Sequence, residues 1–197
     1  RFYSQARGGA SGTVHGQATM RLKVYDVANQ KAALRELAKI AERGMLDPNV
    51  RATAITLTRD VSARDDVGEL NAIFNAVKHG DGRVQALARG VRYVADPRAA
   101  DYFVGPARLL GLCEKGACAE DCDSQSALVA ALAGALGFVV GLRAYGHEGE
   151  DEYVHVYAVA MVPKRDPQEA LGLDTTVDES SVGWEPPRAR ALTAWIH

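Results

Sequence analysis

Three residues of the sequence have the side chains, and the order along the chain, that nucleophilic catalysis at a carbonyl carbon requires. Cys122 stands directly ahead of a smooth apolar stretch, His155 follows in "YVHVYA", and Asp174 follows in "GLDTT". A thiol can attack a carbonyl when an imidazole removes its proton and a carboxylate orients that imidazole. Because unpaired N–H groups at a helix start stabilise a thiolate, we expect a depressed pKa for Cys122 once His155 is charged.

The elements that would position these residues can be read from the second half of the chain. The stretch "SQSALVAALAGALGF" predicts a helix over residues 125–136 that stops at Gly137. Its small side chains would let neighbours approach on all sides, so we expect a central buried helix. Strand patterns follow at residues 138–145, 154–162 and 169–177. His155 lies within the second strand and Asp174 near the end of the third, where antiparallel pairing would make them neighbours on one face.

The first half of the chain is helical in pattern. Apolar residues recur at three- and four-residue spacing from residue 29, and Gly44 suits the end of that helix. Asp47 is the expected N-cap of a second helix and Asp66 that of a third. Helices followed by antiparallel strands predict an α+β fold, with the leading helices covering one side of the sheet.

Three cysteines, Cys113, Cys118 and Cys122, form the pattern C-x4-C-x3-C. An odd number leaves at least one thiol unpaired, which fits a reducing compartment better than a disulfide scaffold. A Cys113–Cys118 disulfide is a sterically possible alternative. A zinc site is a third alternative, although the x2 spacing usual for a zinc knuckle is absent. Two alternatives also apply to the candidate site. His155 could be a structural histidine of the core, and Asp178 could take the place of Asp174 as the carboxylate that orients it.

Composition limits the classes of protein to consider. The 197 residues are 47% apolar with a net charge of −2, which allows a sizeable core and gives no electrostatic reason to expect nucleic acid as a partner. No apolar run is long enough for a membrane span, and the N-terminal residues do not resemble a signal peptide. We predict a flexible or partner-bound arm at residues 1–28, a domain at 29–187 and a tail at 188–197.

The sequence resembles the transglutaminase-like superfamily of papain-like folds, in the form found in tailed-phage and prophage genomes. The resemblance is carried by "EDCDSQSALVAALAGALGF", then "VHVYAVAMVP", then "LGLDTTV", with "VRYVADPRAADYFVGPARLL" before them and "GWEPP" after. It covers roughly residues 47–187. The resemblance implies that Cys122 is the nucleophile, His155 the general base and Asp174 the residue that orients the imidazole. It also makes Tyr93 a candidate oxyanion donor, beside the backbone N–H of Cys122.

What the resemblance implies for function is acyl transfer through a thioester at an amide or peptide bond, by a cysteine peptidase or amidase. One alternative is a virion structural or assembly protein that keeps the fold with little activity, and another is a protein-crosslinking transglutaminase. The expected partner is a protein or peptide substrate. Other phage structural proteins, or a second copy bound through residues 1–17, are further candidates. We expect no cofactor, metal, nucleic acid or membrane partner, and a location in the host cytoplasm or the virion.

Overall fold

The computed structural model describes residues 21–22, 27–95, 101–147, 152–187 and 190–196. Residues 1–17 of the predicted arm at 1–28, and the partner contacts expected of them, lie outside the described residues. The first described elements are a short strand β1 (Arg21–Leu22), which pairs with β3 (Asp101–Tyr102), and the helix α1 (Val27–Met45). This helix starts two residues before the predicted position.

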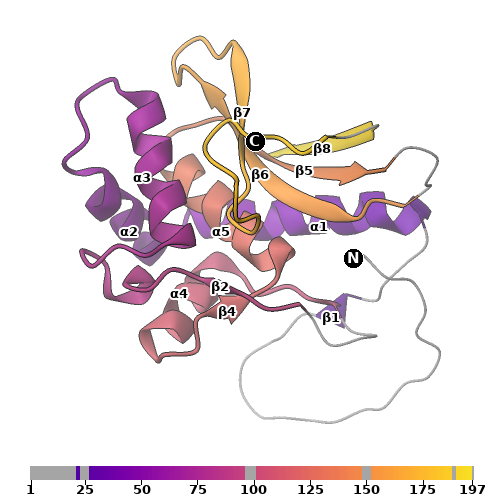
Figure 1. The fold of residues 1–197 in the computed structure, drawn as a ribbon, viewed down its shortest axis with the longest axis horizontal. Coiled ribbons are helices and arrows are strands. Elements are labelled where there is room, and N and C mark those ends of the chain that lie inside the picture. Colours follow the sequence, from indigo (N-terminus) through magenta and orange to yellow (C-terminus); the bar gives the residue numbers. More distant parts are fainter. Residues whose placement is uncertain (1–20, 23–26, 96–100, 148–151, 188–189, 197) are drawn as a thin grey trace.

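A four-stranded antiparallel sheet lies in the upper right part of Figure 1, beside α3. Its strands are β5 (Val140–Gly146), β6 (His155–Val162), β7 (Glu169–Leu173) and β8 (Arg190–Ile196), in the order β7-β6-β5-β8. The predicted α+β class and the interior position of the strand that begins near residue 154 are confirmed. Strand β8 was not predicted: it lies in the expected tail and pairs along its whole length with β5.

The helix α5 (Cys122–Ala135) is the centre of the fold. It packs against β5 and β6 on one side and against the helices α1 to α4 on the others. Every residue from 127 to 133 has 0% exposed surface, although only two of the seven are leucines and one is valine. Small side chains let so many elements reach one helix at native packing density, so the predicted central buried helix is confirmed.

The leading helices were predicted to cover one side of the sheet. Of these, α1 contacts β5 and β8 directly, whereas α2 and α3 pack mainly on α5 and on each other. Two predicted boundaries are corrected. The helix α2 (Pro48–Thr58) is capped by Asp47, whose carboxylate accepts the N–H of Asn49 and Val50. The cap of α3 (Asp66–Lys78) is Asp65 rather than Asp66, because Asp65 accepts the N–H of Gly68.

We predicted that α1 ends at Gly44. The helix instead continues to Met45, and Gly44 lies inside it, where Pro106 and Ala131 pack close to the backbone. The glycine at position 44 therefore indicates close packing of neighbouring elements and not the C-terminal end of the helix.

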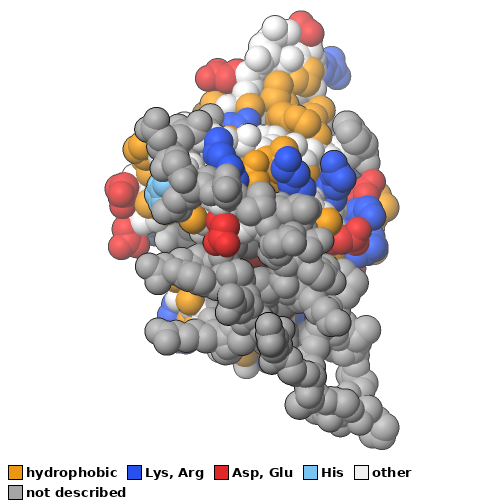
Figure 2. Space-filling view, turned by 90° about the vertical axis from the view of Figure 1, so that its right-hand side faces the viewer, with side chains coloured by type: hydrophobic (Ala, Val, Ile, Leu, Met, Phe, Trp, Pro, Cys, Tyr) orange, Lys and Arg blue, Asp and Glu red, His pale blue; other side chains and the backbone are white. Residues whose placement is uncertain are grey.

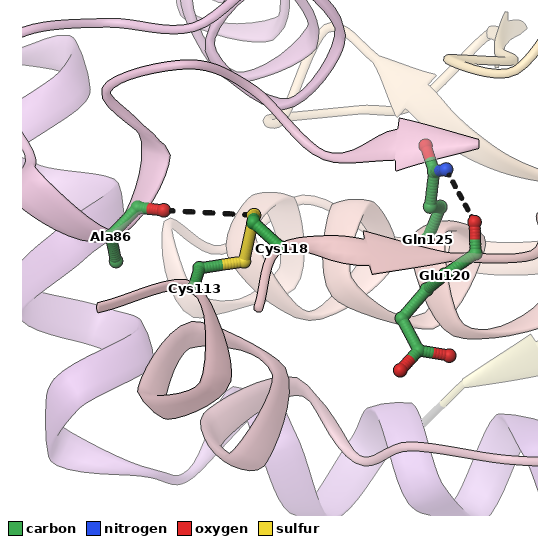
Figure 3. Close-up of a disulfide and its surroundings, with 5 residues drawn as sticks. All are labelled: Ala86, Cys113, Cys118, Glu120 and Gln125. Carbon is green, nitrogen blue, oxygen red and sulfur yellow. Dashed lines mark hydrogen bonds between the residues drawn. A yellow bond between two sulfur atoms is a disulfide. The ribbon is translucent and has the colours of Figure 1, made fainter. Parts of the chain in front are cut away.

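Between α3 and α5 the chain forms short elements that lead into the candidate nucleophile. They are the 3-10 turn η1 (Gln85–Leu87), the strand β2 (Arg92–Tyr93), the helix α4 (Pro106–Glu114), which was not predicted, and β4 (Ala119–Glu120), which pairs in parallel with β2. Cys113 and Cys118 form a disulfide between α4 and β4, and Cys122 is a free thiol (Figure 3). The expectation of reduced cysteines therefore holds only for Cys122, and a zinc site that uses Cys113 and Cys118 is excluded in this state.

The surface carries charges of both signs. On the face shown in Figure 2, Lys and Arg side chains lie among Asp and Glu side chains, with hydrophobic groups between them. None of the described helices combines the length and the apolar character that crossing a membrane would require.

A pair of helical glycines tests the packing around α5. A Cβ atom at Gly44 would lie 2.5 Å from Cγ of Pro106 and 3.1 Å from Cβ of Ala131, so Gly44→Ala should lower the free energy of unfolding by roughly 1–3 kcal/mol through overpacking. Gly111 lies inside α4 with no atom within 4 Å of the same position. Gly111→Ala should therefore raise the free energy of unfolding by roughly 0.5–1 kcal/mol. Urea unfolding of both variants measures the two signs, and a stabilised Gly44→Ala variant would contradict the packing described.

Candidate active site

The N-terminus of α5 places Cys122 at the first helical residue. Asp121 is the N-cap, and its carboxylate accepts the N–H of Asp123 at 3.2 Å and of Ser124 at 3.3 Å. The helix therefore starts at Cys122 and not at the predicted Gln125, because the cap lies earlier than the apolar pattern indicated. Since the cap takes up the next two N–H groups, the N–H of Cys122 is the candidate oxyanion donor at this helix end.

The thiol of Cys122 is buried, with 8% of the residue exposed. It accepts a hydrogen bond from the backbone N–H of Val156, and it donates one to Oδ1 of Asp123 at 3.5 Å. Burial raises the pKa of Cys122 well above its usual value, the charges of Asp123 and Asp121 raise it further, and the Val156 N–H opposes them. The pKa of Cys122 is therefore raised and not depressed in this structure; the depressed pKa expected once His155 is charged stays a prediction.

The structure brings His155 and Asp174 into direct contact. Nε2 of His155 lies 2.8 Å from Oδ2 of Asp174. His155 is the first residue of β6 rather than a mid-strand residue, and Asp174 follows directly after the end of β7. The register pairs Ala158 with Leu173, so the two side chains meet diagonally across the strands and not as an opposed pair. The competing Asp178 is exposed four residues farther on.

Asp174 is held in place as a carboxylate. It is 1% exposed, and burial alone would raise its pKa. Hydrogen bonds from His155 and from the backbone and hydroxyl of Thr176 outweigh burial, so the net pKa of Asp174 lies below its usual value. Thr176 Oγ1 is 2.7 Å from Oδ1 of Asp174, which leaves Oδ2 for the imidazole. Asp174 is therefore ionised at neutral pH and can stabilise an imidazolium.

Tyr145 packs beside His155 in the sheet. It is the cross-strand partner of His155, and the two ring centroids are 5.5 Å apart. Burial raises the pKa of Tyr145, and the charges of Asp174 and Cys122 add to the rise. The thiol of Cys122 also accepts a hydrogen bond from the backbone N–H of Val156, the residue next to His155. Among the described residues the thiol makes no hydrogen bond to the imidazole. Tyr145, the ring partner of His155, was missed by the sequence analysis.

Polar side chains of the first turn of α5 attach the helix to the surrounding strands. Ser126 Oγ donates to the carbonyl oxygen of Val156 at 3.1 Å. Gln125 is fully buried, donates to the Glu120 carbonyl at 2.9 Å and accepts from Thr175 Oγ1 at 3.2 Å. Figure 3 shows the Gln125–Glu120 bond at one end of β4 and the disulfide toward the other. The signal in the sequence was a run of polar residues at the head of an otherwise apolar helix.

Tyr93 lies beside the strand that leads into Cys122. It is paired with Glu120 in the β2–β4 ladder and is 47% exposed.

Among the described residues, no group of three or more His, Cys, Asp or Glu side chains is arranged to hold a metal ion.

The carboxylate next to the thiol gives a prediction about pH dependence. Asp123→Asn keeps the size of the side chain but removes a charge that raises the pKa of Cys122. Since the thiolate is the reactive form, the pH midpoint of alkylation by iodoacetamide should move to lower pH, and the rate at neutral pH should rise several-fold.

Asp121→Asn is the matched comparison. Asparagine still caps a helix, and Asp121 has a smaller effect on the thiol than Asp123, so its shift should have the same sign and be smaller. Equal profiles for wild type and Asp123→Asn would show that the carboxylate does not control the thiol.

Comparison with known proteins does not identify a family. No family model matches the sequence, and no curated protein matches it at a significant level. The resemblance to transglutaminase-like proteins therefore stays a prediction, and the functional inference depends on the arrangement of Cys122, His155 and Asp174.

Proposed function

We propose that this chain is a thiol-dependent acyl-transfer enzyme of the transglutaminase-like, papain-like type, acting on an amide or peptide bond. Cys122 is the nucleophile, His155 the general base and Asp174 the residue that orients the imidazole. The observation that carries the proposal is the 2.8 Å contact between His155 and Asp174, next to a free thiol at a helix N-terminus. The central helix that begins at Cys122 and packs on the antiparallel sheet supports the finer, papain-like assignment.

The contacts of each group support its role. Asp174 engages Nε2 of His155, so in that tautomer Nδ1 is the nitrogen with a lone pair for the thiol proton. As Sγ of Cys122 bonds to the carbonyl carbon, its proton passes to Nδ1. The negative charge that forms on the carbonyl oxygen is stabilised by the N–H of Cys122 and by Tyr93. The C–N bond then breaks, and the imidazolium gives its proton to the leaving amine.

The same groups then act in the opposite sense to hydrolyse the thioester. Water loses a proton to His155 and attacks the thioester carbon, the C–S bond breaks, and the sulfur takes the proton back as a thiol. We favour water over an amine as the acceptor, because most bacterial and phage proteins of the type that the sequence resembles look more like hydrolases. The raised pKa of Cys122 favours loss of its proton during the attack over a thiolate that forms beforehand.

Active-site labelling tests the proposal. A peptidyl electrophile and iodoacetamide should each add one group to the wild-type protein, at Cys122, as read by intact mass and peptide mapping. Cys122→Ala should remove the adduct. His155→Ala should slow the labelling roughly 100-fold or more, since the proton acceptor is lost.

Matched substitutions separate these effects from changes in folding. Asp174→Asn should slow labelling because it favours the wrong tautomer of His155, whereas Asp178→Asn, at an exposed position, should not. His79→Ala removes an exposed histidine at the end of α3 and should leave the rate unchanged. Equal labelling rates in wild type and His155→Ala would refute the proposed base.

Product analysis decides the reaction type. Peptide amides turned over in ¹⁸O-labelled water should give carboxylates that carry the label if the acceptor is water. A new amide formed with an added amine would indicate a transglutaminase instead. A reactive Cys122 without turnover of any peptide amide or glutamine peptide would favour a structural protein that keeps the fold.

A further inference from the structure

Lys78 gathers the chain segment that follows Asp174. It is the last residue of α3, and its ammonium group donates to the carbonyl oxygens of Val177 at 2.7 Å, Asp178 at 3.0 Å and Ser180 at 2.8 Å. Ser180 Oγ is a fourth acceptor at 2.9 Å. Among the described residues no carboxylate pairs with Lys78, so its charge is balanced by carbonyl dipoles of this one segment.

Ser180 continues this network to Asp174 itself. Its hydroxyl lies within hydrogen-bond distance of the backbone carbonyl oxygens of Asp174 and Val177. The path from the Lys78 ammonium to the backbone of Asp174 is therefore two hydrogen bonds long and passes through one buried hydroxyl. Lys78 thus acts on the residue that bears the carboxylate without touching the carboxylate.

No strand ladder holds this segment. β7 ends at Leu173, and the residues from 174 to 187 form turns and irregular structure. Thr176 orients the Asp174 side chain, but Thr176 belongs to the same segment and moves with it. Anchors from outside the segment are therefore needed. Farther along, Arg143 pairs with Glu185, and the N–H of Gly183 donates to the carbonyl oxygen of Gly172. Close to Asp174 the anchors are Gln125, which binds Thr175, and Lys78, which binds residues 177–180.

We propose that Lys78 is a positioning residue of the candidate triad, which holds residues 174–180 so that Asp174 reaches Nε2 of His155. This inference rests on the proposed function in so far as the His155–Asp174 pair serves catalysis. Physically, Lys78 keeps the end of α3 and the chain after β7 at a fixed distance from each other. Removing it should lengthen the contact that is 2.8 Å in the intact protein.

Lys164 offers a matched control. Like Lys78 it lies over a phenylalanine ring, 4.8 Å from the centroid of Phe138, as Lys78 lies 5.2 Å from that of Phe74. Its ammonium group lies 2.6 Å from Oε2 of Glu69, so Lys164 also connects α3 to the chain segment that follows β6. Among the described contacts it has no link to Asp174. Lys164→Met therefore removes a similar ammonium and a similar packing contact away from the site.

The test compares Lys78→Met with Lys164→Met in the full chain. The first readout is the low-field ¹H resonance of the His155 Nε2 proton shared with Asp174, assigned by its loss in Asp174→Asn. We expect Lys78→Met to shift this resonance upfield or broaden it away, and Lys164→Met to leave it in place. The second readout is the rate of Cys122 labelling, which should fall roughly 10- to 100-fold in Lys78→Met only.

Urea unfolding of both variants shows whether the effect exceeds a general loss of stability. A Lys78→Met variant that keeps both the resonance and the labelling rate, at a stability like that of Lys164→Met, would overturn the proposal. If Lys78→Met does not fold, Ser180→Ala removes the hydroxyl link alone, and it should still shift the resonance. An unchanged resonance in that variant would overturn the proposal as well.

The two readouts separate this inference from the proposed function. If the wild-type thiol is unreactive but Lys78→Met still loses the resonance, the enzymatic proposal fails and the positioning role stands. If the wild-type thiol reacts and Lys78→Met alters neither readout, the positioning role fails and the enzymatic proposal stands.

Discussion

The structure depends on burying a whole helix, including its N-terminal end. A helix end has N–H groups without intrahelical partners, and hiding them from water is costly unless other groups accept them. In α5 the carboxylate of Asp121 meets this requirement, and Gln125 and Ser126 add bonds to the neighbouring strands. The polar cluster around Cys122 is therefore a condition for placing α5 between the sheet and the helices, and any chemistry at the thiol occurs within it.

The same burial sets the electrostatic character of the site. Two acidic residues flank the thiol, and a third holds the imidazole, so negative charge is concentrated in a poorly solvated place. Such surroundings favour the neutral form of the Cys122 thiol. The Val156 N–H acts in the opposite direction, and desolvation is the larger effect.

Local patterns in the sequence predicted the parts of the fold that local physics determines. The alanine-rich stretch gave the central helix, the alternation after residue 154 gave β6, and Asp47 with Pro48 gave the start of α2. Asp174 was placed near His155 from strand order alone, and the contact is present, although it is diagonal.

Features that depend on distant partners were missed. Strand β8 follows two prolines and alternates poorly, and its partner β5 lies some fifty residues earlier. Helix α4 is short and contains Gly111, so its pattern is weak. Gly44 looked like a helix stop because the sequence does not show that Pro106 packs against it. Lys78 gave no signal, since its acceptors are backbone carbonyls about a hundred residues away.

The coexistence of a disulfide and a free thiol within ten residues has a consequence for oxidative damage. The thiolate is the form that attacks a peroxide, so a thiol that is buried, and whose pKa is raised, is oxidised slowly to sulfenic acid. The Cys113–Cys118 bond also removes the two nearest thiols that could condense with an oxidised Cys122. In surroundings oxidising enough to keep that bond, Cys122 therefore has no other free cysteine of the same chain with which to form a disulfide.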